Sequence, residues 1–247
     1  MKANRSGQNL THRMVQDLGV AIVTGRYSVR NPFPVEADLC THYGVSRSIV
    51  REAVKMLTAK GLLGSRPRQG TWIQPEETWN LFDPDVLRWL LERKFSFSLL
   101  IDFTQVRLAV EPKAAALAAQ RAGAREREAI KAALERMNAA YDGNESLFAD
   151  IAFHTAVLQA SGNRFYSQLH ELIESALRFS IGMTNHYKGV SRASVADHKR
   201  VSDAIFAGKP QVAEAAMRDL IEEALELIRK AESAAGSRDR LIARAGR

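Results

Sequence analysis

Apolar residues recur at helical spacing along almost the whole chain, and only one short segment departs from that pattern. In the first third, apolar positions three and four residues apart predict helices over 8–24 and 36–43, which Gly25 and Gly44 end. A third helix begins after Ser46, whose hydroxyl is placed to cap a free backbone N–H of the first turn. Its core face consists of four apolar residues at i, i+3, i+4 and i+7: Val50, Ala53, Val54 and Leu57.

The departure from helical spacing follows Gly61. Two short apolar stretches, 62–66 and 71–73, flank a Pro/Gly turn, and this arrangement predicts a β-hairpin. We expect Gly70 in that turn either to adopt a positive φ or to allow the close approach of another group. The predicted domain over 8–74 therefore consists of three helices and a hairpin.

The remainder of the chain contains only helical spacing. Residues 75–83 begin with a proline and hold acidic groups, so we expect a linker there, followed by an all-α helical bundle over 84–232. Pro112 is expected to kink or break one of its helices. The small, polar and basic residues of 233–247 indicate a flexible tail. After 86–122, glycines separate five further amphipathic segments: 124–141, 145–161, 163–184, 191–207 and 210–232.

Charge is distributed unevenly along the chain. Residues 1–75 hold 11 lysines and arginines and 4 acidic residues, which accounts for the entire net charge of +7. A basic patch attracts phosphate groups, so this part of the chain suits nucleic acid. The neutral remainder is typical of a ligand-binding or assembly domain.

Composition also excludes several classes of protein. No apolar run approaches the ~18 residues needed to span a bilayer. Residues 1–7 hold no apolar signal core, so we expect a cytoplasmic protein without a membrane partner. Cys40 is the single cysteine, which excludes an internal disulfide, and we expect it to be a small buried residue.

The basic residues of the first third lie on the elements that read DNA in a helix-turn-helix protein. Arg47 and Arg51 are four residues apart near the N-terminal end of the third helix, where side chains reach base edges in the major groove. Arg66 and Arg68 lie at the tip of the hairpin, as in a wing that touches the DNA backbone or the minor groove. Each arginine alone would be an ordinary surface residue, but the ordered set predicts DNA binding. The expected contact residues are Ser46, Arg47, Ser48, Ile49, Arg51, Arg66, Arg68, Gln69 and Gly70.

This region resembles the winged helix-turn-helix domain of the GntR family of bacterial transcription regulators. Residues 34–39, 45–53 and 61–71 match the family signature in order and spacing. The resemblance implies a homodimer whose recognition helices and wings bind the half-sites of a palindromic operator. Family members often have a DNA-contacting arginine directly after the position of Glu36, and this chain has Ala37 there. We therefore expect the third helix and the wing to supply more of the operator affinity than usual.

One pattern in the helical region suits a metal ion. Asp150 and His154 are four residues apart, so both side chains lie on one face of a helix and can share a divalent cation if a third ligand comes from elsewhere. His198 is the best candidate for that ligand. On spacing alone, an ordinary hydrogen-bonded or exposed Asp/His pair is the alternative. A metal-dependent enzyme using these three residues is a distant alternative, because no base stands nearby and an enzyme does not need a basic wing.

The helical region resembles the FCD domain, the ligand-sensing half of the FadR subfamily of GntR regulators. Members of this type hold a metal with an Asp-x3-His pair and two later histidines, and Asp150, His154 and His198 match the first three ligands. The fourth position falls on Leu220, which cannot bind a metal, and the neighbouring Asp219 lies ~100° around the helix. Two possibilities stay open. Either three residues, water and effector hold a divalent metal such as zinc, or the pocket works without one.

The same resemblance implies that Arg107 faces an effector pocket, where its guanidinium suits a carboxylate. A salt bridge to a neighbouring helix is the alternative. Weaker pocket candidates are Asn163, Arg178 and His186. Residues 36–40, 79–92 and 106–112 also resemble the branch of the family that responds to sugar acids such as galactonate.

Together these expectations describe a mainly α protein with an N-terminal winged helix-turn-helix and a C-terminal helical ligand-binding domain. The expected function is a homodimeric repressor of sugar-acid catabolism that the sugar acid releases from its operator. A regulator of another carboxylate pathway, an activator and a DNA binder without an effector are the alternatives.

Overall fold

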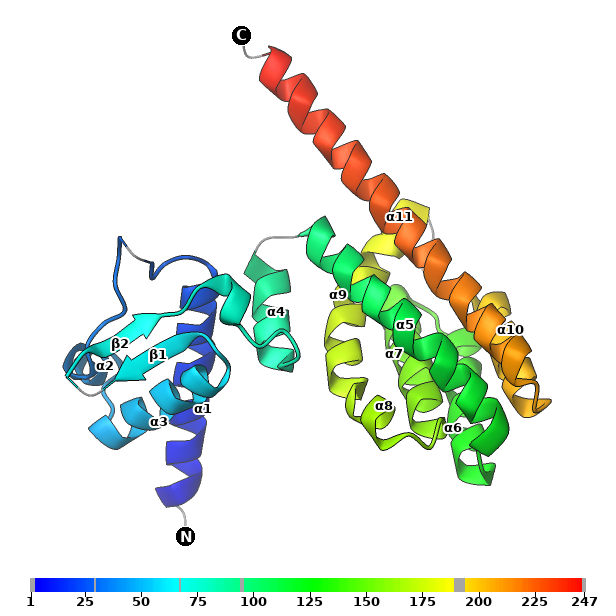
Figure 1. Ribbon diagram of the computed structural model, residues 1–247, viewed down its shortest axis with the longest axis horizontal. Coiled ribbons are helices and arrows are strands. Elements are labelled where there is room, and N and C mark those ends of the chain that lie inside the picture. Colours follow the sequence, from blue (N-terminus) through cyan, green and yellow to red (C-terminus); the bar gives the residue numbers. More distant parts are fainter. Residues whose placement is uncertain (1–2, 29, 67, 94–95, 189–193, 246–247) are drawn as a thin grey trace. The chain divides into compact units, whose positions relative to one another are not determined.

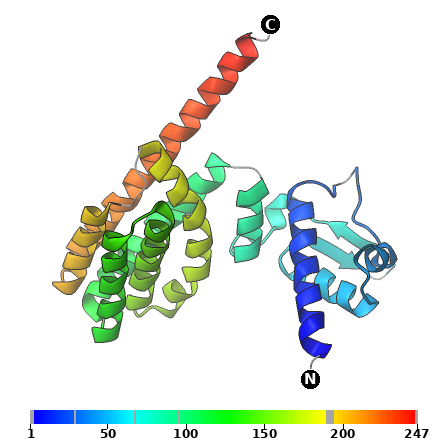
Figure 2. The ribbon, with the colours of Figure 1, turned by 180° about the vertical axis from the view of Figure 1, so that it is seen from behind.

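The computed structural model describes residues 3–28, 30–66, 68–93, 96–188 and 194–245. The chain forms two compact units, Met1–Phe95 and Ser96–Arg247, which are drawn from two sides in Figures 1 and 2. As the sequence predicts, the described residues are mainly helical, and their one sheet is a two-stranded hairpin in the first unit. Among the described residues, no helix is both long and apolar enough to cross a bilayer.

The first unit is a three-helix domain with a hairpin and one further helix. The hairpin strands pair antiparallel, with Leu63 opposite Ile73 and Arg66 opposite Gly70. A continuous apolar core joins the helices, and Leu18, Leu39 and Leu57 are almost fully buried in it. The elements of the first unit are α1 (Ala3–Val23), α2 (Glu36–Tyr43), α3 (Arg47–Ala59), β1 (Leu63–Arg66), β2 (Gly70–Ile73), the 3-10 turn η1 (Glu76–Thr78) and α4 (Pro84–Arg93).

Helix α4 belongs to the first unit, although the sequence places it after a linker at the start of the second domain. Trp89 of α4 is buried, and its ring lies on α1 at Gly19, where an added Cβ would be 2.4 Å from the ring. The Trp89 indole also donates a 2.8 Å hydrogen bond to the side chain of Gln16 on α1. Lys60, which follows α3, forms a 2.7 Å ion pair with Asp83 just before α4. Residues 75–83 are therefore packed against the first unit, and the division between units falls between Phe95 and Ser96.

The second unit is a bundle of helices around α5 and α7. Helix α5 lies along α11 and also contacts α7 (Figure 1). Alanines supply much of the buried face of α5, including Ala114, Ala115 and Ala118, and small side chains let helices approach closely. The elements of the second unit are α5 (Phe97–Arg121), α6 (Ala124–Ala139), α7 (Gly143–Ala160), α8 (Arg164–Gln168), α9 (His170–Lys188), α10 (Val195–Phe206) and α11 (Pro210–Ala245).

Three details of this unit differ from the sequence-based expectation. Helix α5 continues through Pro112, so of the kink or break expected there the break does not occur. The segment expected as one helix over 163–184 is divided into α8 and α9 at Leu169. Helix α11 continues to Ala245, so the structure has helix where a flexible tail was expected, and 246–247 lie outside the described residues.

Candidate functional sites: an exposed basic helix and a buried Asp-His-His cluster

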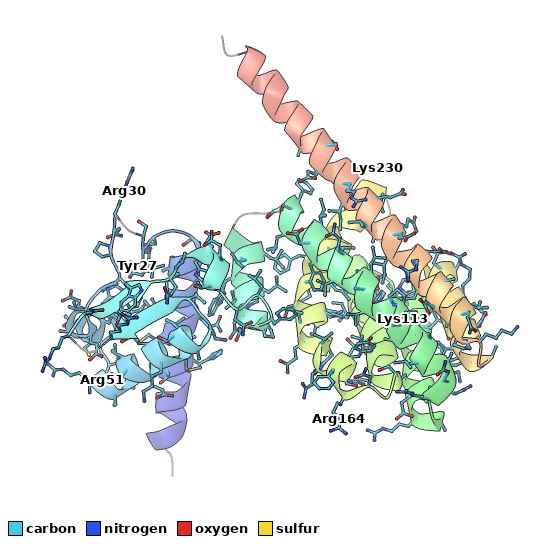
Figure 3. The ribbon with its side chains drawn as sticks, in the orientation of Figure 1. Tyr27, Arg30, Arg51, Lys113, Arg164 and Lys230 are labelled. Atoms are coloured by element: carbon cyan, nitrogen blue, oxygen red, sulfur yellow. The ribbon has the colours of Figure 1, made fainter. Side chains whose placement is uncertain are left out.

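Helix α3 presents one apolar and one polar face, as its sequence predicts. Gly44 adopts a left-handed conformation with φ 63° and ends α2, which allows the chain to turn into α3. The four predicted core residues of α3 are all buried. Arg47, Ser48 and Arg51 are exposed, and Figure 3 shows the Arg51 side chain pointing away from the unit. The residues expected to contact DNA on α3 are therefore accessible, apart from Ile49, which is half-buried against the core.

Ser46 occupies the N-cap position of α3 but does not cap it through its side chain. Its backbone is extended, as an N-cap requires, yet the hydroxyl makes no bond to a helix N–H. It lies instead 2.8 Å from the hydroxyl of Ser48. The predicted helix start is confirmed and the predicted capping bond is wrong, because a second hydroxyl two residues away competes for the first.

Arg51 is held by an acidic residue that the sequence analysis did not select as a site residue. Its Nε donates to the Glu36 carboxylate at the start of α2, at 3.0 Å to Oε2 and 3.3 Å to Oε1. Both side chains remain well exposed, at 63% for Arg51 and 40% for Glu36. This contact uses Nε, whereas the two terminal amino groups of an arginine form the fork that binds guanine. The pair therefore orients the guanidinium without using that fork.

The hairpin tip has the geometry of a basic wing. Arg66, Arg68, Gln69 and Gly70 are all exposed. Arg68 and Gly70 both have positive φ, at 67° and 82°. An added Cβ at Gly70 would meet nothing within 4 Å, so the backbone conformation, rather than a close approach, explains the glycine. The guanidinium of Arg66 lies 5.9 Å from the centre of the Trp72 ring, which supports it at the edge of the hairpin.

The three predicted metal ligands come together inside the second unit. Asp150 and His154 lie on α7 and His198 on α10, and all three are buried. Their ligand atoms lie within 4.8 Å of one another. Nε2 of each histidine is 3.2 Å from Oδ1 of Asp150. Among the described residues no fourth ligand joins this Asp-His-His cluster, because Asp219 is exposed and Leu220 is apolar.

The arrangement of His198 fits a metal ligand. Its Nδ1 lies 2.7 Å from the backbone carbonyl oxygen of Ser194, an acceptor that requires a proton on Nδ1. Nε2 is then the ring nitrogen that faces the cluster, and its lone pair would be available to a bound cation. A metal-binding histidine in proteins almost always donates its other ring N–H to such an acceptor. Two imidazoles and a carboxylate form a donor set that suits zinc and similar divalent cations.

Arg107 is buried next to the cluster, where it is paired within its own helix. Its Nε donates a 2.6 Å hydrogen bond to Oε1 of Glu111, four residues further along α5. The other carboxylate oxygen of Glu111 lies 2.5 Å from Nδ1 of His154. Sequence reasoning allowed for a salt bridge from Arg107 to a neighbouring helix, and the observed partner is instead on α5. Glu111 itself was missed, although its spacing from Arg107 is that of an i, i+4 ion pair.

Charged neighbours shift the pKa values of the buried residues Glu111, Asp150 and His154. Burial alone raises the pKa of Glu111, but Arg107 and His154 outweigh burial and lower it from 4.5 to about 2. Burial likewise raises the pKa of Asp150, and the two histidines outweigh it and hold that pKa far below its usual value. Burial lowers the pKa of His154, whereas Glu111 and Asp150 raise it, and the net direction is upward. The carboxylates are therefore ionised and available to accept hydrogen bonds at neutral pH.

These shifts predict an acid-sensitive fold. A carboxyl group whose folded pKa is lowered contributes stability that is complete above its unfolded pKa and is lost as the pH falls toward its folded pKa. For Glu111 the window runs from 4.5 down to about 2, and the shift corresponds to roughly 3 kcal/mol. Urea unfolding followed by the helical circular dichroism signal should show the free energy of unfolding falling through this window. Glu111→Gln should fall less steeply; parallel curves for the two proteins would contradict the assignment.

The weaker pocket candidates have other roles where the structure describes them. The Asn163 side chain caps α8 by accepting a 3.0 Å hydrogen bond from the Phe165 N–H. Arg178 forms a 2.6 Å ion pair with Glu174 and lies over the Phe148 ring at the surface. The side chain of His186 lies outside the described residues. Cys40, expected to be buried, is half-buried on α2 and packs against the core of the first unit.

Comparisons with known proteins decide the family. The description "Bacterial regulatory proteins, gntR family" matches residues 10–73, and the FCD domain matches 102–223. The chain is 39% identical to the galactonate operon transcriptional repressor of Escherichia coli over 171 aligned residues. These residues are 69% of this chain and 75% of that protein. The chain belongs to the GntR family of bacterial transcription regulators. This GntR regulator carries its FCD domain in the second unit, so the families that match it are those of regulators and not of enzymes.

Two further proteins place this GntR regulator among its relatives. The putative L-lactate dehydrogenase operon regulatory protein of Escherichia coli is 31% identical over 192 residues, which cover 74% of this chain and 72% of that protein. A crystal structure of a putative GntR transcriptional regulator from Rhodococcus sp. RHA1 matches with a TM-score of 0.50 and 19% identity, covering 90% of this chain and 98% of the other. The structural match supports the fold.

Proposed function

We propose that this GntR regulator is a repressor that a sugar acid of the galactonate type releases from its operator. The observation that carries the proposal is the buried Asp-His-His cluster with Arg107 beside it, in the same chain as an exposed basic helix and wing. The relative with 39% identity is a galactonate operon repressor, which supports both the sign of regulation and the class of effector.

The DNA-binding unit is proposed to act as one half of a homodimer. In that arrangement, α3 of each subunit enters the major groove of one half-site and the wing lies against the backbone or in the minor groove. Arg47 and Arg51 are the residues with the length and donor groups for guanine or phosphate. Ala37 contributes no charged contact, so the affinity rests on α3 and the wing.

The second unit is proposed to hold the effector through its carboxylate. Asp150, His154 and His198 would hold a divalent cation, and such a cation would supply positive charge for a bound carboxylate. Glu111 already balances the charge of Arg107. An anionic effector therefore needs a further positive charge in this buried site, which the three-residue cluster would provide by holding the metal. The guanidinium of Arg107 would orient the carboxylate.

Release requires that the effector bind the two states of the dimer differently. A coupling free energy of about 1–3 kcal/mol changes operator affinity ~5- to 150-fold. The effector would favour an arrangement of the DNA-binding units that does not fit the spacing of the two half-sites.

A second candidate effector is a smaller hydroxy acid. The relative named for the L-lactate dehydrogenase operon is 31% identical over 74% of this chain, which favours this alternative. An operator selected from a random DNA pool can be used in a gel shift with D-galactonate, L-lactate and D-galactose. We expect release by D-galactonate and none by D-galactose, which lacks a carboxylate. Release by L-lactate alone would replace the sugar acid with a hydroxy acid, and release by none would contradict effector control by this class.

Glu36→Gln tests whether the Glu36–Arg51 pair tunes DNA recognition. Without the carboxylate, Arg51 loses its orientation, while one negative charge near the phosphates disappears. We therefore expect operator affinity relative to non-specific DNA to fall about 2- to 5-fold, the range of an exposed ion pair. Fluorescence anisotropy with both DNAs at one salt concentration measures this ratio.

Asp38→Asn is the matched control for that experiment. Asp38 is exposed on the same short helix, and the substitution removes the same charge without touching Arg51. It should strengthen binding to both DNAs slightly and equally. Identical behaviour of the two variants would show that Glu36 acts only through its charge.

A further inference from the structure

We propose that Glu111 is the positioning residue of the second unit, which fixes His154 for the metal and Arg107 for the effector at the same time. The inference rests on the metal and effector site of the proposed function and adds a residue and a role to it. Glu111 is 1% exposed, so no bulk water competes for its carboxylate.

One oxygen of Glu111 sets the tautomer of His154. Oε2 lies 2.5 Å from Nδ1, and an ionised carboxylate only accepts hydrogen bonds. Nδ1 must therefore carry a proton. Once a cation is bound, Nε2 is left with its lone pair, on the side where Asp150 and His198 lie. The opposite tautomer would direct a lone pair at the carboxylate and a proton at the metal position.

The other oxygen of Glu111 fixes the guanidinium. Oε1 accepts a 2.6 Å hydrogen bond from Nε of Arg107, so the planar guanidinium is held at Nε, the nitrogen nearest the side-chain stem. Nη2 then lies 3.4 Å from both ring nitrogens of His154, which places this terminal amino group next to the cluster. The Glu111 carboxylate therefore fixes the His154 imidazole and the Arg107 guanidinium in position relative to one another. A purely charge-balancing Glu111 would not need to meet both partners in this way.

Glu111→Gln removes this double acceptor while keeping the shape of the side chain. Its amide oxygen can accept from only one partner, and its NH₂ then faces the N–H of the other. Titration of the full-length protein with Co²⁺, followed by the visible absorption of the bound ion, should show about 10- to 100-fold weaker binding and an altered spectrum. Binding within about threefold of the wild type, with the same spectrum, would overturn the proposal.

Glu214→Gln is the matched control. Glu214 on α11 forms a 2.7 Å ion pair with Lys113, which is labelled on α5 in Figure 3. Glu214 is not part of the Asp-His-His cluster. The substitution removes an ion pair from the same helix without changing any proposed ligand or its partner. Its Co²⁺ affinity and spectrum should match those of the wild type. A loss equal to that of Glu111→Gln would show that general destabilisation of α5 explains both.

The wild type alone supplies a test that does not depend on a variant folding. In ¹⁵N-histidine-labelled protein loaded with Cd²⁺, NMR should show His154 with a proton on Nδ1 and Cd²⁺ on Nε2. The reverse assignment would overturn the proposal. Wild-type protein that binds neither Co²⁺ nor Cd²⁺ would overturn it as well, whereas operator release by a sugar acid would then still support the proposed function.

Discussion

Arg51→Ala is expected to weaken operator binding about 10- to 100-fold without altering the fold. A bidentate contact between arginine and a base contributes about 1–3 kcal/mol of discrimination, and Ala37 means that α2 supplies no arginine at that position to compensate. Arg51 is 63% exposed and its ion pair with Glu36 lies at the surface, so its removal should change stability very little. Fluorescence anisotropy with labelled operator measures the dissociation constant, and a melting curve checks the fold.

Arg200→Ala provides the comparison for this variant. Arg200 is an exposed arginine of α10 in the second unit, so the substitution removes the same charge from a unit that holds none of the predicted DNA-contacting residues. It should leave operator affinity within about twofold of the wild type, because Arg200 belongs to neither the recognition helix nor the wing. Equal operator affinities for Arg51→Ala and the wild type would contradict the assignment of α3 as the recognition helix.

Arg107→Ala is expected to destabilise the second unit by about 3–5 kcal/mol, the loss that follows when one partner of a buried ion pair is removed. Glu111 would remain as a buried carboxylate without its guanidinium, and its pKa, held at about 2, would rise. From the sequence alone we would expect this substitution to affect only the effector response. The buried pair explains why it should also affect the fold.

Arg107→Lys separates the two effects. Lysine keeps the positive charge next to Glu111 but lacks the planar fork, so most of the stability should be retained. Effector binding, measured by calorimetry, should be weakened at least tenfold. Urea unfolding of both variants provides the free energies. An Arg107→Ala protein as stable as the wild type would show that the Arg107–Glu111 pair does not hold the buried site together.

The sequence predicts most reliably where the signal is local. The buried and exposed faces of α3 follow from the spacing of apolar residues within one helix, and the left-handed Gly44 marks the turn before it. The Asp150–His154 pair is equally local, because helical geometry fixes the two side chains on one face. His198 was a candidate for the third ligand that no local spacing linked to this pair, and the structure brings it to the other two ligands.

The features that the sequence did not predict depend on contacts between distant residues. Helix α4 joins the first unit through the packing of Trp89 on Gly19, which no local pattern reveals. Glu111 on α5 contacts His154 on α7. The sequence spacing between Arg107 and Glu111 predicts only their contact within α5 and not the contact with His154. The polar composition of residues 233–245 predicts a flexible tail, whereas their alanines and arginines favour the helix that the structure has there.

The most direct test of the central claim is the ratio of operator dissociation constants with and without D-galactonate, measured for the wild type and for His198→Ala. The central claim is that the buried cluster in the second unit controls the affinity of the first unit for DNA. The account predicts that saturating D-galactonate weakens wild-type binding at least ~5-fold, within the range of ordinary allosteric coupling. His198→Ala should bind the operator as tightly as the wild type without ligand and lose this response. An operator affinity that D-galactonate leaves unchanged in the wild type, or a His198→Ala variant that responds normally, would contradict the account.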